Sequence, residues 1–243
     1  MQQEWQTAHL RFSVFSATPI ADTDRLFEDF FRLPPESRSS QKASFVTELT
    51  AQRDNAVHRL IATGPKLDLV IAAAIEAGTV PNALPVLAGA EKIRQAFVSA
   101  SRELIGRLEG VRRVAVGEQL VLPAASRSEA YRRMSSFLPD VKVDSEGSSD
   151  FLYRINRPRR IDIDKSEVVV NRLSHWVCVV LLVNIRAGDV TQSMPVSDAV
   201  SLTTDVNSVP EYDVSHLSPH NRGVLVETLF AMSQEIAEKG DIA

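Results

Sequence analysis

Four arginines between residues 154 and 160 have the most distinctive chemistry in this sequence: Arg154, Arg157, Arg159 and Arg160. An arginine fork binds a phosphate or a carboxylate through two parallel hydrogen bonds, and it also stacks on nucleic-acid bases. Pro158 lacks a backbone N–H donor and therefore favours a loop or the edge of a sheet for this segment. The four arginines are our candidate binding residues, for nucleic acid or for an acidic protein surface.

The same arginines also allow a structural interpretation. Acidic residues follow them at Asp162, Asp164 and Glu167, so the segment would be a solvated hairpin with its own ion pairs. Proteins that bind single-stranded nucleic acid stack bases on aromatic rings, and only Phe151 and Tyr153 lie near the arginines. The sequence leaves both interpretations open.

Two short patterns have the spacing of an acid–base pair or of a cation site. Asp162 and Asp164 would project from one face of an extended strand, and Asp205 and Asn207 would do the same. Carboxylate and amide oxygens bind divalent cations, and two neighbouring carboxylates can act as acid and base. Asp162, Asp164 and Asp205 are therefore the candidates if the protein is an enzyme with an acidic site in the concavity of its sheets.

Other chemical signatures are missing from the sequence. It contains no glycine-rich phosphate loop, no G-x-S-x-G esterase motif and no H-E-x-x-H zinc motif. The single cysteine, Cys178, lies in an apolar run and is predicted to be a small core residue and not a nucleophile. We expect no catalytic residue of these types, no metal and no cofactor.

The composition is that of a globular protein without membrane spans. Hydrophobic residues make up 44% and charged residues 24% of the chain. No apolar run reaches the ~20 residues of a transmembrane helix, and neither a signal peptide nor a cysteine framework is present, so we expect a cytoplasmic protein. The region 102–160 is basic and the region 161–243 is acidic. This asymmetry allows an anionic partner, and it allows a homo-oligomer in which these regions of neighbouring copies meet.

Periodicity predicts the elements that position these side chains. The first half reads as a strand, a helix, a polar loop, three strands and a long helix: His9–Phe15, Asp24–Leu33, Glu36–Lys42, Phe45–Thr50, Ala56–Ala62, Leu67–Ala73 and Ala90–Leu108. The second half repeats this order: the strand Val111–Leu122, a helix capped by Ser126, a loop at Asp144–Asp150, strands at Phe151–Asn156, Val168–Ile185 and Ala199–Val206, and a helix from Pro219 to Gly240. Leu173–Ile185 is so apolar that we predict a strand buried on both faces or in the middle of a sheet.

These elements predict an α+β fold, a pseudo-duplicated unit of strand, helix, antiparallel meander and long helix. The two halves are residues 1–110 and 111–243, and each would bury the apolar stripe of its long helix against a curved sheet. Joining the two sheets edge to edge would remove two exposed strand edges, which favours joining.

Two stretches of the second half are similar to a known family. VRRVAVGEQLVLP (Val111–Pro123) resembles the mid-chain strand of an uncharacterised, sporadically distributed bacterial family, and LTTDVNSV (Leu202–Val209) resembles its closing strand. That family usually has an Arg-Tyr-x-Asn sequence in the mid-chain strand, where this chain has Gly117-Glu118-Gln119, and Glu118 is also the polar exception on that strand's apolar face. The resemblance implies no activity and no catalytic residue. At the level of fold alone, the duplicated order is also similar to the saddle-shaped TATA-binding fold.

The sequence supports three hypotheses about function. The first is a non-enzymatic interaction or adaptor protein, or a complex subunit, that docks on a protein partner. The second is a nucleic-acid-binding module that uses the segment from Arg154 to Arg160. The third is an enzyme with a site in the concave face of the sheets that uses Asp162, Asp164 or Asp205.

Overall fold

The computed structural model describes residues 4–41, 43, 45–75, 81, 83–187 and 190–241, with the side chains of 183–187 and 190–194 left aside. Its strands are β1 (Gln6–Ser16), β2 (Ser37–Gln41), β3 (Val46–Arg53), β4 (Ala56–Thr63), β5 (Lys66–Ala73), β6 (Val111–Ala124), β7 (Leu152–Asn156), β8 (Arg159–Ile163), β9 (Ser166–Ala187) and β10 (Val190–Ser208). Its helices are α1 (Thr23–Phe31), α2 (Ala90–Arg107), α3 (Arg127–Ser135) and α4 (Pro219–Lys239), with a 3-10 turn η2 (Val214–His216). The predicted α+β class is confirmed.

All these strands belong to one antiparallel sheet, in the order β2-β3-β4-β5-β1-β6-β10-β9-β7, and β8 also pairs with β9. The two halves of the chain meet where β1 pairs with β6, which places Phe12 opposite Val116 and Val14 opposite Val114. Each half follows the order strand, helix, further strands and long helix, while the duplication itself stays a prediction.

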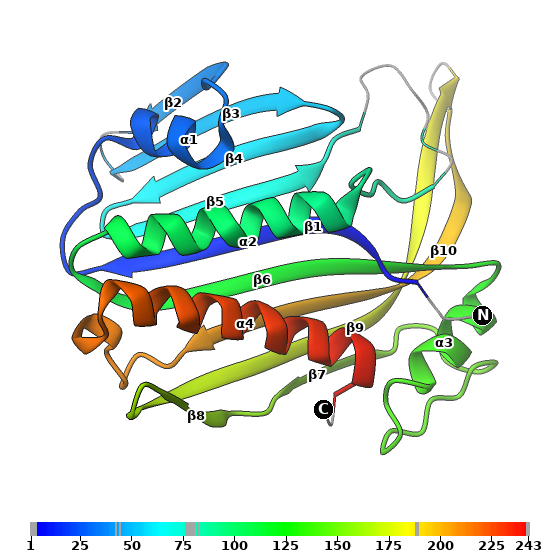
Figure 1. Ribbon diagram of the computed structural model, residues 1–243. Helices are drawn as coiled ribbons and strands as arrows, with labels where there is room; N and C mark the ends of the chain where they lie inside the picture. Colours follow the sequence, from blue (N-terminus) through cyan, green and yellow to red (C-terminus); the bar gives the residue numbers. More distant parts are fainter. Residues whose placement is uncertain are drawn as a thin grey trace.

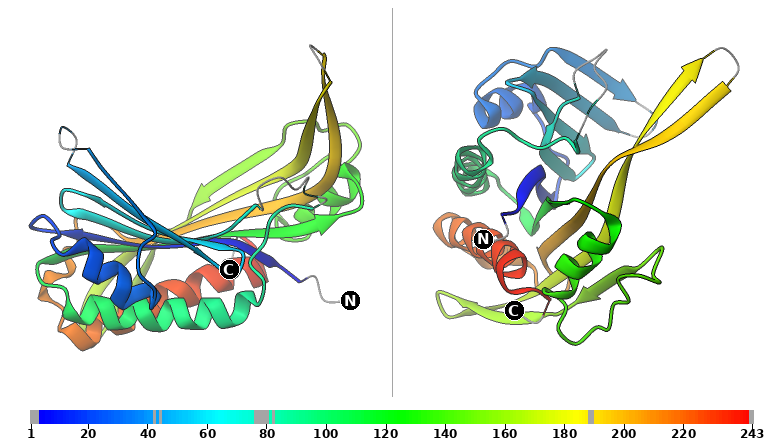
Figure 2. Two further views of the ribbon diagram at one scale, coloured as in Figure 1. Left: turned by 90° about the horizontal axis from the view of Figure 1, so that it is seen from above. Right: turned by 90° about the vertical axis from the view of Figure 1, so that its right-hand side faces the viewer.

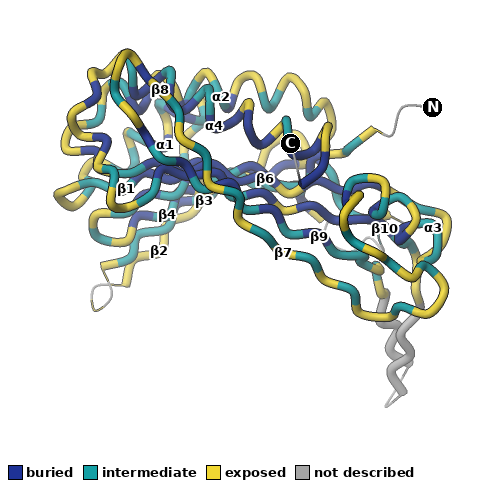
Figure 3. Tube along the Cα trace, turned by 90° about the horizontal axis from the view of Figure 1, so that it is seen from below, coloured by how far each residue is buried: buried dark blue, intermediate teal, exposed yellow. Residues whose placement is uncertain are grey.

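The main core lies between the sheet and the helices α1, α2 and α4, which cover one of its faces (Figure 1). Leu10, Phe12 and Val14 alternate along β1 and are fully buried beneath these helices, as strand periodicity predicts. Buried residues concentrate in this layer (Figure 3), and both ends of the sheet curve away from the helices (Figure 2). The opposite face of the sheet, which we call the helix-free face, carries no helix over its centre.

Capping chemistry agrees with the predicted helix ends. Ser126 Oγ accepts a hydrogen bond from the Glu129 N–H at 3.2 Å, and α3 begins at the next residue. Ser218 Oγ likewise accepts from the Asn221 N–H at 3.2 Å, with Pro219 as the first residue of α4. Gly240 ends α4 with a φ of 86°, which favours glycine.

One prediction about strands is wrong, and another is confirmed only in part. Glu36–Lys42 was expected to be a loop, but β2 forms there with every residue exposed, because pairing with β3 satisfies its backbone whatever its side chains are. Leu173–Ile185 was expected to be buried on both faces or to lie in the middle of the sheet; β9 does lie between β10 and β7, but it is not buried on both faces. Trp176 is fully buried, but Val180 is 45% and Leu182 51% exposed, because the far ends of β9 and β10 leave the sheet as a two-stranded arm (Figure 2).

Candidate functional site

An ion pair lies at the centre of the helix-free face. Arg11 of β1 donates from Nη2 to Asp205 Oδ2 of β10 at 2.8 Å, across the intervening strand β6. The residue of β6 between them is Gly117, which pairs with both Arg11 and Asp205 in the sheet register. A Cβ atom at Gly117 would lie 3.2 Å from Arg11 Nη2, so glycine leaves the room that the guanidinium occupies.

Hydrogen bonds extend this ion pair toward β7. Asn207 Nδ2 donates to Asp205 Oδ1 at 2.7 Å, and Asn207 Oδ1 accepts from Arg113 Nη2 at 2.7 Å and from Asn171 Nδ2 at 3.1 Å. Asn171 Oδ1 in turn accepts from Asn156 Nδ2 of β7 at 2.9 Å. We call these side chains the central polar network: Arg11, Arg113, Asn156, Asn171, Asp205 and Asn207.

A second group of contacts continues the polar surface over the first half. Phe15 lies between two cations, with the Arg113 guanidinium 4.9 Å and the Lys66 ammonium 5.7 Å from its ring centre. Lys66 pairs with Asp68 at 2.7 Å, and Ser13 Oγ donates to the same carboxylate at 2.6 Å. These contacts fix the orientation of charged groups on a surface that no helix covers.

His9 lies on this face and is held in its neutral form. Burial, and then the charges of Arg11 and Arg59, lower the pKa of His9 below its ordinary value. The imidazole is therefore neutral at neutral pH and contributes hydrogen-bonding groups to the face, not charge.

The structure separates the four arginines proposed as binding residues. Arg157 pairs with Asp241 at 3.0 Å and Arg159 with Glu235 at 3.0 Å, both at the C-terminal end of α4. Arg160 pairs with Glu167 at 2.6 Å across the β8–β9 hairpin, as the structural interpretation expected for one of the acids. Arg154 is exposed and makes no hydrogen bond or ion pair with the described part of the chain.

The three candidate aspartates do not form a common site. Asp162 and Asp164 were expected to share one face of a strand, but β8 ends at Ile163, and Asp164 adopts a φ of 51° in the turn to β9. Asp164 accepts a hydrogen bond from Asn221 there, whereas Asp205 belongs to the central polar network. Among the described residues, no group of three His, Cys, Asp or Glu side chains is arranged to hold a metal ion.

A buried charge pair lies on the other side of the sheet, beneath α2 and α4. Arg94 Nε donates to Glu118 Oε1 at 2.9 Å, and Ser233 Oγ donates to Glu118 Oε2 at 2.7 Å. Glu118 is only 2% exposed, and it borders a cavity of about 490 Å³ between the two helices. Its oxygens are satisfied by the two helices, so Glu118 joins them to the sheet.

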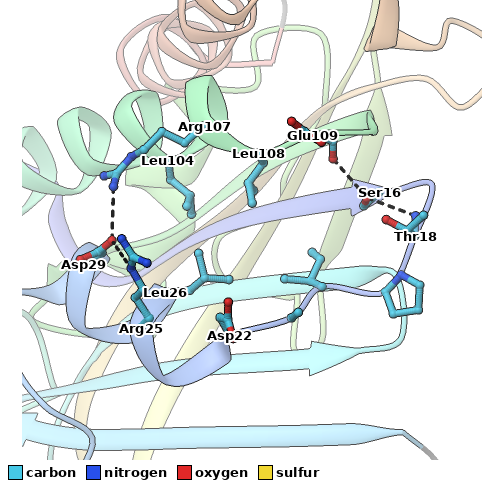
Figure 4. Close-up of a pocket in the computed structure, with 13 residues that line it drawn as sticks. Ser16, Thr18, Asp22, Arg25, Leu26, Asp29, Leu104, Arg107, Leu108 and Glu109 are labelled. Atoms are coloured by element: carbon cyan, nitrogen blue, oxygen red, sulfur yellow. Dashed lines mark hydrogen bonds and ion pairs between the residues drawn. The ribbon is translucent and has the colours of Figure 1, made fainter.

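A further cavity of about 320 Å³ lies between the start of α1 and the end of α2 (Figure 4). Asp29 accepts from Arg107 Nη1 at 3.2 Å and pairs with Arg25 at 3.9 Å, while Leu26, Leu104 and Leu108 supply the apolar lining. Arg107 also pairs with Glu103 at 2.7 Å, so these ion pairs lie at the contact of α1 with α2 and serve the packing of the two helices.

The cysteine prediction leads to a test of reactivity. Burial raises the pKa of the half-buried Cys178 thiol to about 12, so almost no thiolate is present at pH 8. We expect alkylation of native Cys178 by iodoacetamide at pH 8 to be at least ~100-fold slower than in the urea-unfolded chain. Mass spectrometry of timed samples measures both rates, and similar rates would contradict the assigned burial.

None of the helices in the described ranges is both long and apolar enough to cross a membrane. Comparisons with known proteins give no further assignment, because no family model, no curated protein and no solved structure matches this chain.

Sequence reasoning missed most of the central polar network. The alternation of β1 does place Arg11 opposite the buried Leu10 and Phe12, and a glycine inside a strand indicates a close approach of another group. Asn156 and Asn171 gave no signal of their own, because their contacts depend on strand pairing.

Proposed function

We propose that this chain is a non-enzymatic interaction protein that docks on a protein partner through the helix-free face. The supporting observation is that three cations of this face are each paired with a carboxylate. Arg11 pairs with Asp205 at 2.8 Å, Arg59 with Glu48 at 3.0 Å and Lys66 with Asp68 at 2.7 Å. A nucleic acid is bound by a strongly positive surface. The three ion pairs leave only Arg113 and Arg154 as cations without a carboxylate partner among the described residues of this face, which favours a protein partner over a nucleic acid.

Apolar side chains lie between these pairs. The register of the sheet places half-buried apolar residues on this face, among them Phe15, Val57, Ile61, Val70, Leu173 and Val177. A mixture of apolar groups, fixed hydrogen-bonding groups and paired charges is the usual composition of a protein–protein interface.

The alternative functions have weaker support. A nucleic acid bound by the arginine segment would have to replace the carboxylate partners of Arg157, Arg159 and Arg160. The expected acid–base pair of Asp162 and Asp164 does not share a strand face, because Asp164 lies in the turn after β8. Asp205, the other candidate, is held in an ion pair with Arg11.

A cytoplasmic location, membership of a bacterial family and a homo-oligomeric state remain part of this proposal. A free cysteine is in keeping with a reducing compartment. The acidic region 161–243 is the part that would meet the basic region of a second copy.

A large cationic side chain at the centre of the face tests the proposal. We expect Thr203→Arg and Gln119→Arg, both at exposed positions of this face, to weaken partner binding by tenfold or more, or about 1.4 kcal/mol, through steric conflict. The partner is first identified by affinity purification of the full-length protein from its host with nuclease, and affinities are then measured with purified components.

The matched control is Ser99→Arg, the same kind of change at an exposed position of α2 on the other side of the sheet. It should leave the affinity unchanged. The proposal would be overturned if Thr203→Arg and Gln119→Arg bound the partner as tightly as the wild type does. It would also be overturned if nuclease treatment alone removed the partner.

A further inference from the structure

We infer that the free edge of β7 is a site where an extended, acidic segment of a protein partner adds to the sheet as a further strand. The inference rests on the proposed function and names how such a partner would be held. It begins from an asymmetry of the sheet. Outward from the β1–β6 pair, one side has β5, β4, β3 and β2, whereas the other has β10, β9 and then β7, with no counterpart of β2 among the described residues.

The position beside β7 is vacant for a local reason. In the first half, the chain leaves α1 and forms β2, which pairs with β3. In the second half, the chain leaves α3 and passes through turns between residues 139 and 151 without forming a strand, so the outer edge of β7 stays unpaired. The same sheet thus accepts a strand at this position in one half and lacks it in the other.

The backbone of β7 presents its unused groups at that edge. The Arg157 N–H donates to the Arg172 carbonyl of β9 at 3.1 Å, and the register continues through Ile155 opposite Ser174 and Tyr153 opposite Trp176. Alternate residues of an antiparallel pair exchange hydrogen bonds. Leu152, Arg154 and Asn156 therefore direct their N–H and C=O groups away from β9, and Pro158, which has no N–H, ends the usable edge.

The side chains of the same residues identify the partner's chemistry. Leu152 is 59% exposed, which is unusual for a large apolar residue on a sheet edge. Arg154 is exposed and has no carboxylate partner in the described part of the chain. Side chains two residues apart share a face, so the added strand would place an apolar residue beside Leu152 and an acidic residue beside Arg154.

Charge excludes the obvious alternative, which is another copy of this chain. Antiparallel pairing of two β7 edges about Arg154 would place two arginines opposite each other, which is destabilising. The other edge strand, β2, contains no acidic residue, and its Arg38 already pairs with Asp24, so β2 offers Arg154 no carboxylate. An acidic segment of a different protein is the occupant that fits.

Synthetic peptides test the inference with the full-length protein. The probe is a fluorescein-labelled peptide of sequence TVEVEVT, and its controls are TVKVKVT and a TVEVEVT peptide N-methylated at alternate residues. By fluorescence anisotropy at low salt, we expect the acidic peptide to bind and both controls to bind at least ~10-fold more weakly. Failure of the acidic peptide to bind at millimolar concentration would overturn the inference, as would equal binding of the N-methylated peptide.

Two variants locate the site. Arg154→Glu should reverse the preference between acidic and basic peptides, whereas Arg132→Glu, at an exposed arginine of α3, should not. Leu152→Pro should abolish binding of TVEVEVT without unfolding the protein, because the Leu152 N–H makes no bond within the sheet. Independently of any variant, added peptide should protect the amides of Leu152, Arg154 and Asn156 from hydrogen exchange, and unchanged exchange there would contradict the inference.

The inference and the proposed function can fail separately. If a purified partner loses affinity with Thr203→Arg but not with Leu152→Pro, docking on the helix-free face stands and strand addition at β7 is wrong. If peptide addition at β7 is observed while Thr203→Arg binds the partner normally, the edge alone is the binding site and the docking proposal is wrong.

Discussion

Replacing Arg94 by methionine is expected to lower the free energy of unfolding by about 3–5 kcal/mol, because it leaves the buried Glu118 carboxylate without its cation. Glu118 is 2% exposed, and Arg94 lies 2.9 Å from it while also donating from Nη2 to the Phe230 carbonyl of α4 at 2.9 Å. One side chain of α2 therefore bridges the sheet and α4. Urea denaturation of the wild type and the variant at pH 7 measures the difference.

The chain offers a matched control between the same two helices. Arg102 of α2 pairs with Glu227 of α4 at 2.8 Å, but both side chains are more than 40% exposed. Arg102→Met should therefore cost less than about 1 kcal/mol. The double variant Arg94→Met with Glu118→Leu should recover much of the lost stability, because no buried charge remains. If Arg94→Met lowered the free energy of unfolding no more than Arg102→Met does, the prediction that the Arg94–Glu118 pair stabilises the fold would be wrong.

The second large effect is expected for Glu235→Gln, which we predict to lower the free energy of unfolding by about 2–3 kcal/mol at pH 7. Glu235 Oε2 accepts from Arg159 at 3.0 Å and from Arg172 at 3.2 Å, and the Arg172 side chain is only 3% exposed. Burial lowers the pKa of Arg172, with the charge of Arg159 acting in the same direction and Glu235 opposing it. Glutamine would keep the shape of the side chain but remove the negative charge that stabilises the buried Arg172 guanidinium.

The same carboxylate gives the prediction a pH dependence. Burial alone would raise the pKa of Glu235, but the hydrogen bond from Lys239 and the charges of Arg159 and Arg172 lower it below its ordinary value of 4.5. A lowered native pKa means that this stabilisation is complete above pH ~4.5 and is lost as the pH falls through the native pKa. The difference in unfolding free energy between wild type and Glu235→Gln should therefore shrink on acidification. Glu227→Gln, at an exposed position of the same helix, should show neither effect.

The sequence predicted the layers of this fold better than the contacts across them. Alternation along β1 and the capping serines of α3 and α4 are local signals, and they located a strand and two helix starts. β2 was missed because SRSSQ has no apolar alternation, and its strand depends on pairing with β3. Asp164 was placed wrongly because a two-residue turn with positive φ interrupts the strand that its spacing implied.

The candidate site was less accessible to sequence reasoning for a geometric reason. Arg11 and Asp205 are 194 positions apart in the chain, and they meet only because β1 and β10 both pair with β6. Glu118 was recognised as a polar exception in an apolar strand, but its partners come from two helices, at Arg94 and Ser233. Long-range pairing of this kind leaves no local pattern in the sequence.

The β1–β6 pair also affects how the chain can fold while it is being synthesised. β1 leaves the ribosome before both strands that pair with it. It can pair with β5 as soon as the first half has emerged, but its other edge stays open until residues 111–124 follow. The apolar side of α2 lacks its neighbour α4 for longer still, because α4 is the last helix of the chain. Non-local pairing of this kind slows folding and exposes strand edges and apolar surface in the meantime. The nascent first half therefore exposes a strand edge and apolar helix surface, the features that chaperones bind, until α4 packs over the sheet.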